Sequence, residues 1–338
     1  MLLLGIETSC DETGVALAEF GGGRRPAVLC EKLASQERVH EAYGGVVPEL
    51  AAREHLRNLP YLVHALCSDG GVSLRDVAAV GVTRGPGLKG CLLIGFCFAK
   101  GLAAAGGLPL IGVNHIEAHV HTAMLDNPDL DYPFLALIVS GGHTEIVEVL
   151  GLGRYRLLAR TIDDAAGEAF DKSANLLGFP YPGGARLAAL ADSCSGSPFS
   201  LPRVMRDSPG FSFSGLKTAI ALLIEEQGGR AANQDVRAAL AFAIQEAIVD
   251  ALCWKLKRAA GASGLNRVAV VGGVSANRCL RERVAGLKGV KAYFPQLRHC
   301  VDNGAMAAYL AALRLLAGER TEIEVDVLAR WPIEEQAG

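Results

Sequence analysis

The stretch FLALIVSGGHTEIVEVL, residues 134–150, contains two apolar segments joined by the short turn SGGH. Apolar segments on either side of a glycine-containing turn are typical of a β-hairpin. An earlier stretch, GIETSCDETGVALAEF at residues 5–20, has the same order of strand, polar turn and strand. We interpret the two stretches as a weak internal repeat, about 130 residues apart, in which each copy opens one lobe of the protein.

Strand and helix patterns alternate around the two hairpins. The expected strands lie at 27–35, 77–87, 109–113, 267–273 and 290–294, and the expected helices lie at 48–66, 87–105, 184–193, 214–227 and 234–260, with two more beginning at Ser275 and Asp302. This order predicts an α/β protein with a mixed sheet in each lobe. Because no low-complexity linker separates the halves, we expect packed lobes, 1–125 plus 302–338 and 126–301, with a cleft between them.

Composition limits the class of protein. The chain has 338 residues, is 50% hydrophobic and has a net charge of −3, so a nucleic-acid partner would need a local basic patch or a helper protein. Its most apolar run, 90–99, is shorter than the roughly 20 residues that cross a bilayer. The opening MLLLGIETSC has no basic region or cleavage site, and the nine cysteines form no C-x-x-C pair. We expect a cytoplasmic protein with reduced cysteines and no membrane partner.

Three histidines lie within GVNHIEAHVHTA, residues 112–123. His115 and His119 are four apart, which puts both rings on one face of a helix, whereas His121 falls on another face. The spacing suits a metal, although packing or capping explains such a pair about as well. Asp302, in CVDNGAMAAYL, could supply the carboxylate that the pair lacks, or could cap the helix that follows. Two imidazoles and one carboxylate are a common set for zinc or non-haem iron.

The turns offer possible phosphate sites. Gly141 and Gly142 would let a phosphate approach the backbone, although a plain hairpin turn is the simpler reading. A third glycine pair, in VVGGVSAN at 270–277, ends a strand before a helix. Asp11 and Glu12 in the first turn could serve only the turn, or could orient a phosphate, a metal or an attacking amine as catalytic residues. Asp171 could be a solvated helix acid or could bind ribose hydroxyls.

Two other enzyme motifs are disfavoured. Ser214 and Lys217 match the S-x-x-K of penicillin-recognising enzymes, but no S-D-N accompanies them. His115-Ile116-Glu117-Ala118-His119 resembles a zincin helix, yet its glutamate is third rather than second in the motif. At about 100° per residue, Glu117 would point roughly 160° away from either histidine. A metalloprotease is therefore disfavoured.

The three glycine turns, in this order, resemble the two-lobed fold of actin, hexokinase and the heat-shock chaperone ATPases. Nearly the whole chain is similar to the tRNA N6-adenosine threonylcarbamoyltransferase family, TsaD, in its bacterial branch. The stretches that carry the resemblance are GIETSCDETGVAL, HEAYGGVVPELAAREHLRNL, GPGLKGCLLIG, VNHIEAHVHTA, LIVSGGHTEIV, DDAAGEAFDKSANLLG, YPGG, FSFSGLKTA, VVGGVSANRCLRE and CVDNGAMAA. Ala185, His299 and Val301 depart from the family pattern, and His299 is a possible extra metal ligand.

The resemblance implies one divalent metal ion, Fe²⁺ or Zn²⁺, held by His115, His119 and Asp302. It implies contacts with an adenine nucleotide or threonylcarbamoyl-AMP from Ile138, Val139, Ser140, Gly141, Gly142, Asp171, Gly184 and Asn277. The implied reaction moves a threonylcarbamoyl group to the exocyclic amine of the adenosine just 3′ of the anticodon, in tRNAs that read codons beginning with A. The implied partners are tRNA, a paralogous subunit of the same fold and a small ATPase.

Basic residues that could contact tRNA are Arg53, Arg57, Lys89, Arg203, Arg206 and Lys217. Two other functions remain open. One is an ATP-dependent carbamoyltransferase or kinase that acts on a small molecule without tRNA. The other is a nucleotide-gated scaffold, whose function would survive loss of the metal ligands.

Overall fold

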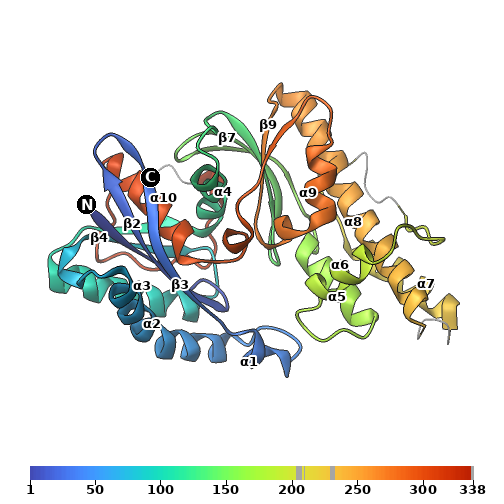
Figure 1. The fold of residues 1–338 in the computed structure, drawn as a ribbon, viewed down its shortest axis with the longest axis horizontal. Helices are drawn as coiled ribbons and strands as arrows, with labels where there is room; N and C mark the ends of the chain where they lie inside the picture. Colours follow the sequence, from blue (N-terminus) through green and yellow to red (C-terminus); the bar gives the residue numbers. More distant parts are fainter. Residues whose placement is uncertain (203–207, 209, 229–232, 336–338) are drawn as a thin grey trace. The chain divides into compact units, whose positions relative to one another are not determined.

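The computed structural model describes residues 1–202, 208, 210–228 and 233–335 (Figure 1). The chain divides into two compact units. Unit 1 comprises Met1–Asp129, Leu152–Arg154 and Pro295–Gly338, and unit 2 comprises Leu130–Gly151 and Tyr155–Phe294. The functional lobes expected from the sequence, bounded at 125/126 and 301/302, remain a prediction.

Unit 1 contains a five-stranded sheet in the order β3-β2-β1-β4-β5. The strands are β1 (Leu2–Glu7), β2 (Glu12–Gly21), β3 (Arg24–Ser35), β4 (Val77–Gly85) and β5 (Leu110–Asn114). β1 runs antiparallel to β2 and parallel to β4, so the predicted mixed sheet with an antiparallel start is confirmed. Because β4 and β5 are parallel to β1, the carboxyl ends of all three strands meet at one edge of the sheet.

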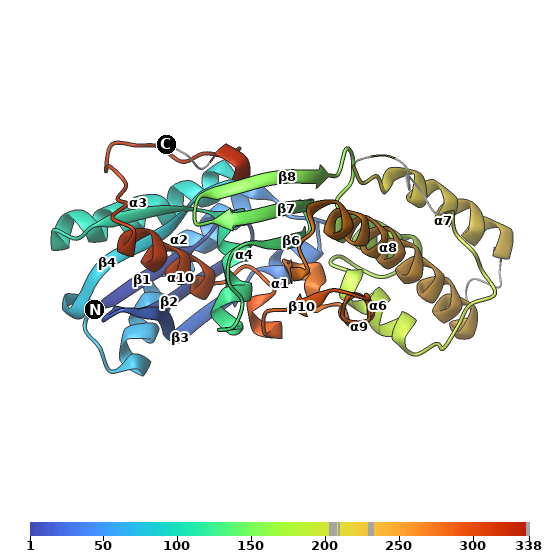
Figure 2. The same ribbon diagram turned by 90° about the horizontal axis from the view of Figure 1, so that it is seen from above.

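Helices cover both faces of this sheet (Figures 1 and 2). The covering helices are α2 (Pro48–Gly70), α3 (Lys89–Gly106), α4 (His115–Asp126) and α10 (Gly304–Leu316). Unit 1 also contains the short helix α1 (Glu37–Glu41) and 3₁₀ turns at Leu74–Asp76, Leu297–His299 and Ile333–Glu335. Side chains alternate along β1, so Leu4 packs in a core with α2 and α3, whereas Leu3 packs in a second core with α10.

α10 packs very closely on the β1–β2 hairpin because small residues line the contact. A Cβ on Gly304 would lie 2.3 Å from the carbonyl carbon of Val15, and a Cβ on Gly14 would lie 2.5 Å from the nitrogen of Gly304. Only glycine permits that approach. The first turn of α10, and Asp302 just before it, are thereby held beside the amino end of β2.

α3 is the one helix in the described part of the chain that has the length and apolar composition to cross a membrane. Its side chains Leu92, Phe96 and Ala99 are buried in the core of unit 1 with those of α2 and the sheet. A buried core helix passes the same test of length and composition, so α3 is explained by its packing on β4.

Unit 2 repeats the sheet of unit 1. Its strands are β6 (Phe134–Val139), β7 (Thr144–Gly151), β8 (Arg154–Arg160), β9 (Arg267–Val271) and β10 (Lys291–Tyr293), in the order β10-β9-β6-β7-β8. β6 pairs antiparallel with β7 and parallel with β9, as β1 pairs with β2 and β4 (Figure 2). The internal repeat read from the two hairpins is therefore confirmed.

The helices of unit 2 form one large core with its sheet. They are α5 (Ala166–Leu176), α6 (Gly184–Asp192), α7 (Ser214–Gln227), α8 (Gln234–Ser263) and α9 (Arg278–Ala285), with a 3₁₀ turn at Gly273–Ala276. The sequence patterns did not predict β8 or α5. The helix expected from Ser275 begins instead at Arg278, because the chain first makes the 3₁₀ turn and Asn277 then caps α9.

Candidate active site

α4 carries the histidine pair and begins where β5 ends, as the sequence predicted. Asn114 is its N-cap, and Oδ1 of Asn114 accepts from the backbone N–H of Ile116 at 2.9 Å and of Glu117 at 3.1 Å. A carbonyl acceptor at this position satisfies two of the N–H groups that a helix start leaves free. The cap therefore fixes His115 as the first residue of the helix, at the carboxyl edge of the sheet.

His115, His119 and Asp302 come together in unit 1. One ligand atom from each of the three lies within 4.8 Å of the others. Nε2 of His119 is 2.9 Å from Oδ1 of Asp302, and Nε2 of His115 is 3.6 Å from the same oxygen. Both rings are almost fully buried, at 7% and 1% exposure. Two imidazole nitrogens and one carboxylate oxygen suit Zn²⁺ or Fe²⁺, so these residues fit a divalent metal.

Glu7 and Ser9 lie behind His115. Nδ1 of His115 is 3.1 Å from Oγ of Ser9 and 3.4 Å from Oε2 of Glu7, whose side chain is fully buried. Oε1 of Glu7 also accepts from the N–H of Ser9 at 2.5 Å. An acceptor at Nδ1 favours the tautomer that leaves Nε2 free for a metal. The sequence analysis missed Glu7, although a carboxylate inside an apolar strand was a visible signal.

The charge on His115 depends on its two carboxylate neighbours. Burial by itself would lower the pKa of His115, but Asp302 and Glu7 outweigh burial and raise that pKa to about 9. In the metal-free chain the ring is therefore protonated at neutral pH. A metal ion at this position would displace that proton, because a ligating imidazole must be neutral.

Asp302 does not cap α10, contrary to one of the two sequence readings. The helix begins at Gly304, and its N-cap is Asn303, whose Oδ1 accepts from the N–H of Met306 at 2.9 Å. Nδ2 of Asn303 donates to the carbonyl of Val301 at 2.7 Å. Asn303 thus supplies the cap, and the carboxylate of Asp302 meets the histidines instead.

His299 lies outside this group of three residues. Its Nδ1 is 2.8 Å from Oδ2 of Asp126, and its Nε2 is 3.5 Å from Oε1 of Glu31. Although burial opposes the charge, these two carboxylates raise the pKa of His299 to about 9. The ring is engaged on both sides, so the idea that it is an extra ligand is not supported. His121 is also separate, because its Nδ1 donates to the carbonyl of Glu117 at 2.8 Å.

Asp11 lies in the turn between β1 and β2, and Glu12 is the first residue of β2, at the edge of the sheet that also carries His115. Burial, together with the negative charges of Asp11 and Asp302, raises the pKa of Glu12 well above its ordinary value. A carboxylate whose pKa is raised in this way is a stronger base than an ordinary carboxylate. This is a property expected of a general acid or base, and the catalytic role of both residues remains a prediction.

The turn between β6 and β7, in unit 2, contains the predicted glycines. Ser140 closes it, with its N–H donating to the carbonyl of His143 at 2.9 Å. Gly141 and Gly142 are exposed, and a Cβ on either would meet no atom within 4 Å. Neither the fold nor a positive φ requires glycine here. By contrast, Ile138 and Val139 are fully buried.

Asp171 and Gly184 contact each other. Oδ1 of Asp171 accepts from the N–H of Gly183 at 3.0 Å and of Gly184 at 2.7 Å, at the start of α6. A Cβ on Gly184 would lie 3.1 Å from that oxygen. Burial nevertheless raises the pKa of Asp171 above its ordinary value. Asp171 is therefore not a plain solvated acid, because its Oδ1 is hydrogen-bonded to the start of α6.

Asn277 is hydrogen-bonded to Gln245, which lines a hollow of about 470 Å³ in unit 2. Its Oδ1 accepts from the N–H of Leu280 at 2.9 Å, and its Nδ2 donates to Oε1 of Gln245 at 2.7 Å. Gln245 lines the hollow together with Asp192 and Arg278, which pair at 2.9 Å. Asn277 therefore acts there by orienting Gln245, in addition to capping α9.

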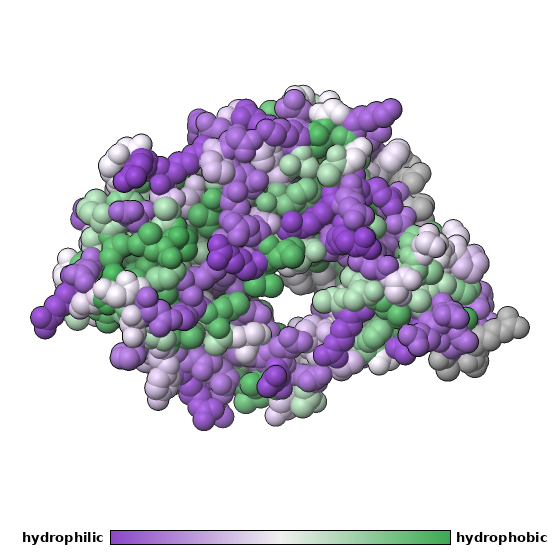
Figure 3. All heavy atoms as spheres, viewed as in Figure 1, coloured by the Kyte–Doolittle hydropathy of each residue, from purple (hydrophilic) through white to green (hydrophobic). Residues whose placement is uncertain are grey.

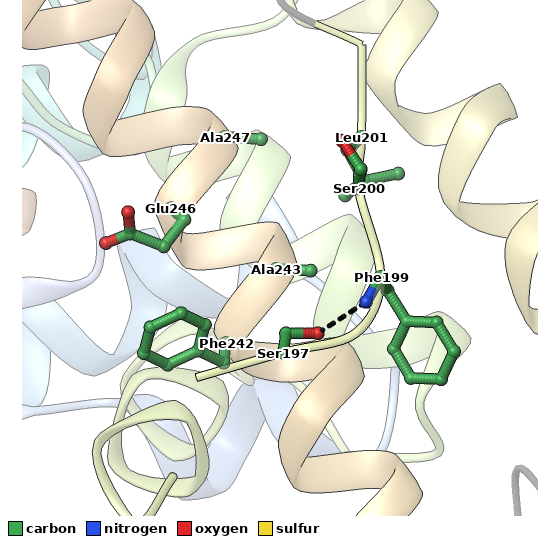
Figure 4. Close-up of a pocket in the computed structure, with 8 residues that line it drawn as sticks. All are labelled: Ser197, Phe199, Ser200, Leu201, Phe242, Ala243, Glu246 and Ala247. Atoms are coloured by element: carbon green, nitrogen blue, oxygen red, sulfur yellow. Dashed lines mark hydrogen bonds between the residues drawn. The ribbon is translucent and has the colours of Figure 1, made fainter. Parts of the chain in front are cut away.

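A second hollow, of about 170 Å³, lies between α8 and residues 197–201 (Figure 4). Phe242, Ala243 and Ala247 of α8 face this segment, in which the N–H of Phe199 donates to Oγ of Ser197 at 3.1 Å. Glu246 lines both hollows. None of the predicted nucleotide residues lines this smaller hollow.

The fold and the clustered residues define a class of protein, a duplicated α/β fold with glycine turns and a His-His-Asp cluster. Among solved structures it is similar to HypF of T. kodakarensis, with a TM-score of 0.60, 16% identity, and coverage of 94% of this chain and 48% of that one. It is also similar to component A of the (R)-2-hydroxyglutaryl-CoA dehydratase of Acidaminococcus fermentans, with a TM-score of 0.57 and 16% identity over 94% and 99% of the two chains. At this identity the likeness shows the fold alone.

The sequence comparisons show the family. The family model for TsaD, tRNA N6-adenosine threonylcarbamoyltransferase, matches residues 27–309. Proteins with that name are 49% identical in Variovorax paradoxus, over 98% of this chain and 96% of the relative, and 48% identical in Legionella pneumophila, over 98% and 100%. The chain belongs to the tRNA N6-adenosine threonylcarbamoyltransferase family, and the resemblance read from its motifs is confirmed.

Proposed function

We propose that this chain transfers a threonylcarbamoyl group from threonylcarbamoyl-AMP to the exocyclic amine of the adenosine 3′ of the anticodon, in tRNAs that read codons beginning with A. The observation that carries the proposal is the meeting of His115, His119 and Asp302 in a member of this family. The reaction breaks the bond between the carbonyl carbon and the phosphate oxygen, forms a carbon–nitrogen bond, and releases AMP and a proton.

Each part of the site has a proposed task in this reaction. A divalent ion held by His115, His119 and Asp302 would act as a Lewis acid toward the negatively charged donor. Gly141 and Gly142 would leave the backbone N–H groups of their turn open to the donor's phosphate. Glu12, whose pKa is raised, would accept the proton that the attacking amine loses. The tRNA and the glycine turns would together hold amine and carbonyl in line.

Partners and location extend the proposal. Arg53, Lys89 and Lys217 are exposed and suit tRNA contacts, whereas Arg57 already pairs with Glu54 at 2.9 Å. Arg203 and Arg206 lie outside the described residues. The paralogous subunit of the same fold and the small ATPase are proposed from the family resemblance, and we propose that all act in the cytoplasm.

Unit 1 has exposed apolar surface that suits a protein partner. Leu56 and Tyr61 of α2 are 62% and 77% exposed, and Leu29 and Leu33 of β3 are 54% and 44% exposed. An apolar area lies over β2 and β3 in Figure 3. Large exposed side chains of this kind favour contact with another protein, as a partner subunit would require.

The experiment is reconstitution. The chain, its proposed partners, the acyl-adenylate and unmodified tRNA are mixed, and the modified nucleoside is measured with His119→Ala as the comparison. Transfer that needs tRNA and is lost in His119→Ala supports the proposal. Turnover of a small carbamoyl acceptor without tRNA would favour the small-molecule transferase instead, and full function in His119→Ala would favour the scaffold.

A further inference from the structure

Glu117 lies between the two cluster histidines in sequence, and its side chain points to the other side of α4. It is fully buried, and Arg314 of α10 donates to its Oε2 from Nε at 3.1 Å and also from Nη2. Oε1 of Glu117 accepts from the N–H of Gly153 at 3.3 Å. Arg314 is 6% exposed and also pairs with Glu319. Both oxygens of a buried carboxylate are thus held by unit 1.

This ion pair joins the two helices that determine the geometry of the cluster. α4 carries His115 and His119, and α10 begins two residues after Asp302. Stability alone explains the pair poorly, because buried ion pairs can often be replaced by apolar side chains of similar size without loss of stability. A fixed relation between the two helices is a better explanation, since the guanidinium fork, with Nε and Nη2 both donating to Oε2 of Glu117, is a charge-assisted contact that restricts the direction of approach.

The required precision can be estimated from helix geometry. Side-chain tips lie about 5–6 Å from a helix axis, so rotating α4 by about 20° would move its histidine nitrogens by about 2 Å. A Zn–N bond is itself only about 2 Å long. A modest rotation of α4 against α10 would therefore separate the donors by as much as one full metal–ligand bond.

We propose that Glu117 and Arg314 are positioning residues, which lock α4 against α10 so that the two imidazoles and the carboxylate of Asp302 converge. The inference rests on the proposed metal site and adds the residues that set its geometry. Neither side chain supplies a ligand atom to the cluster of His115, His119 and Asp302.

The test replaces the pair while preserving the fold. Arg314→Met removes the cation that pairs with the buried carboxylate of Glu117. The double variant Glu117→Met with Arg314→Met removes both charges. Arg314→Lys keeps the charge but loses the fork, and it covers the case in which the double variant does not fold. The control is Arg156→Met in unit 2, which removes an exposed arginine that donates from Nε and Nη2 to the two oxygens of a buried glutamate, Glu148. Zn²⁺ affinity is measured by competition with a chromogenic chelator, and folding by urea denaturation.

We expect the double variant to be more stable than Arg314→Met and yet to bind Zn²⁺ on the order of 10–100-fold more weakly than the unaltered chain. We expect a smaller loss of affinity in Arg314→Lys and none in Arg156→Met. A purely structural pair predicts that affinity recovers together with stability. Zn²⁺ affinity equal to that of the unaltered chain in the folded double variant, or in Arg314→Lys if the double variant does not fold, would overturn the inference.

The same titration separates this inference from the proposed function. If the unaltered chain and His119→Ala bind Zn²⁺ equally well, the metal site itself is refuted, and the positioning role with it. If the unaltered chain binds Zn²⁺, His119→Ala does not, and the double variant binds as the unaltered chain does, only the positioning role is refuted.

Discussion

Asp302 and Asn303 are adjacent residues to which the structure gives different tasks. Asp302 meets the histidines, with Oδ1 2.9 Å from Nε2 of His119, and Asn303 caps α10. Asp302→Asn preserves size and hydrogen-bonding capacity but removes the charge, whereas Asn303→Ala removes the cap and leaves the carboxylate. Asp302→Asn should therefore weaken metal binding with little effect on stability. Asn303→Ala should lower stability and leave metal binding unchanged.

The magnitudes follow from these contacts. The Asn at position 302 can still accept from the ring of His119, so at about pH 10, where His115 is neutral, the free energy of unfolding of the metal-free protein should change by less than about 1 kcal/mol. The metal affinity of Asp302→Asn should fall at least about 100-fold. Removing a residue that only hydrogen-bonds to a metal ligand already costs about 10–100-fold, and Asp302 is proposed to be a ligand itself. Asn303→Ala loses a cap worth about 1 kcal/mol. It also loses a buried bond to Val301 worth about 1 kcal/mol, so it should be about 2 kcal/mol less stable.

The assay pairs urea unfolding of chelator-treated protein with a Zn²⁺ titration of each folded variant. Asn303→Asp is the control, since Asp and Asn cap about equally well and the carboxylate at 302 is retained. The reasoning is refuted if Asp302→Asn binds Zn²⁺ as tightly as the unaltered chain. It is also refuted if Asn303→Ala loses the metal while remaining folded.

Three further predictions test other parts of the site. Gly142→Val should leave stability nearly unchanged but weaken binding of the acyl-adenylate, as measured by calorimetry. Gly272→Ala should instead destabilise the fold, because Gly272 has a φ of 90° and a Cβ there would lie 2.5 Å from a backbone oxygen. The raised pKa of His299, about 9 against the usual 6.5, should contribute up to about 3 kcal/mol of stability below pH 6.5 and lose it as pH rises through 9. In urea titrations at pH 6 and pH 10, His299→Gln should reduce this loss of stability and leave the part that the raised pKa of His115 contributes; an unchanged profile would contradict the role of His299. Glu7→Gln should weaken Zn²⁺ binding about 10-fold, and unaltered affinity would show that Glu7 does not orient His115.

The sequence predicted the fold best where its pattern was local. Each hairpin, the helix from Pro48 and the strand before His115 follow from apolar periodicity and turn residues. The repeat also follows, because two similar hairpins imply two similar sheets. β8 and α5 were missed, and α9 starts three residues later than expected, since capping by Asn277 depends on a 3₁₀ turn that periodicity does not reveal.

The sequence predicted the pairing of His115 with His119 on one helix face, but not the contacts that support the pair. The spacing of His115 and His119 predicts a shared helix face, and the structure bears this out. Sequence alone could not decide whether Asp302 caps a helix or meets the histidines, because two adjacent polar residues can each be the N-cap. The partners Glu7 and Arg314 lie more than one hundred residues from the histidine helix in the chain. Only the folded structure brings them to α4.

The composition of α4 supports a functional reading of the whole helix. Ten consecutive residues, from His115 to Met124, are buried, and five of them are polar or ionisable. Burying such groups costs free energy unless each has a hydrogen-bond partner, so an apolar helix at this position would be buried at a lower cost in free energy. The structure gives His115, Glu117, His121 and Thr122 hydrogen-bond partners, and His119 meets Asp302. Nδ1 of His119 alone among the described side-chain atoms of this helix has no partner. A helix that carries so many buried polar groups is best explained by a requirement for the His115–His119 pair.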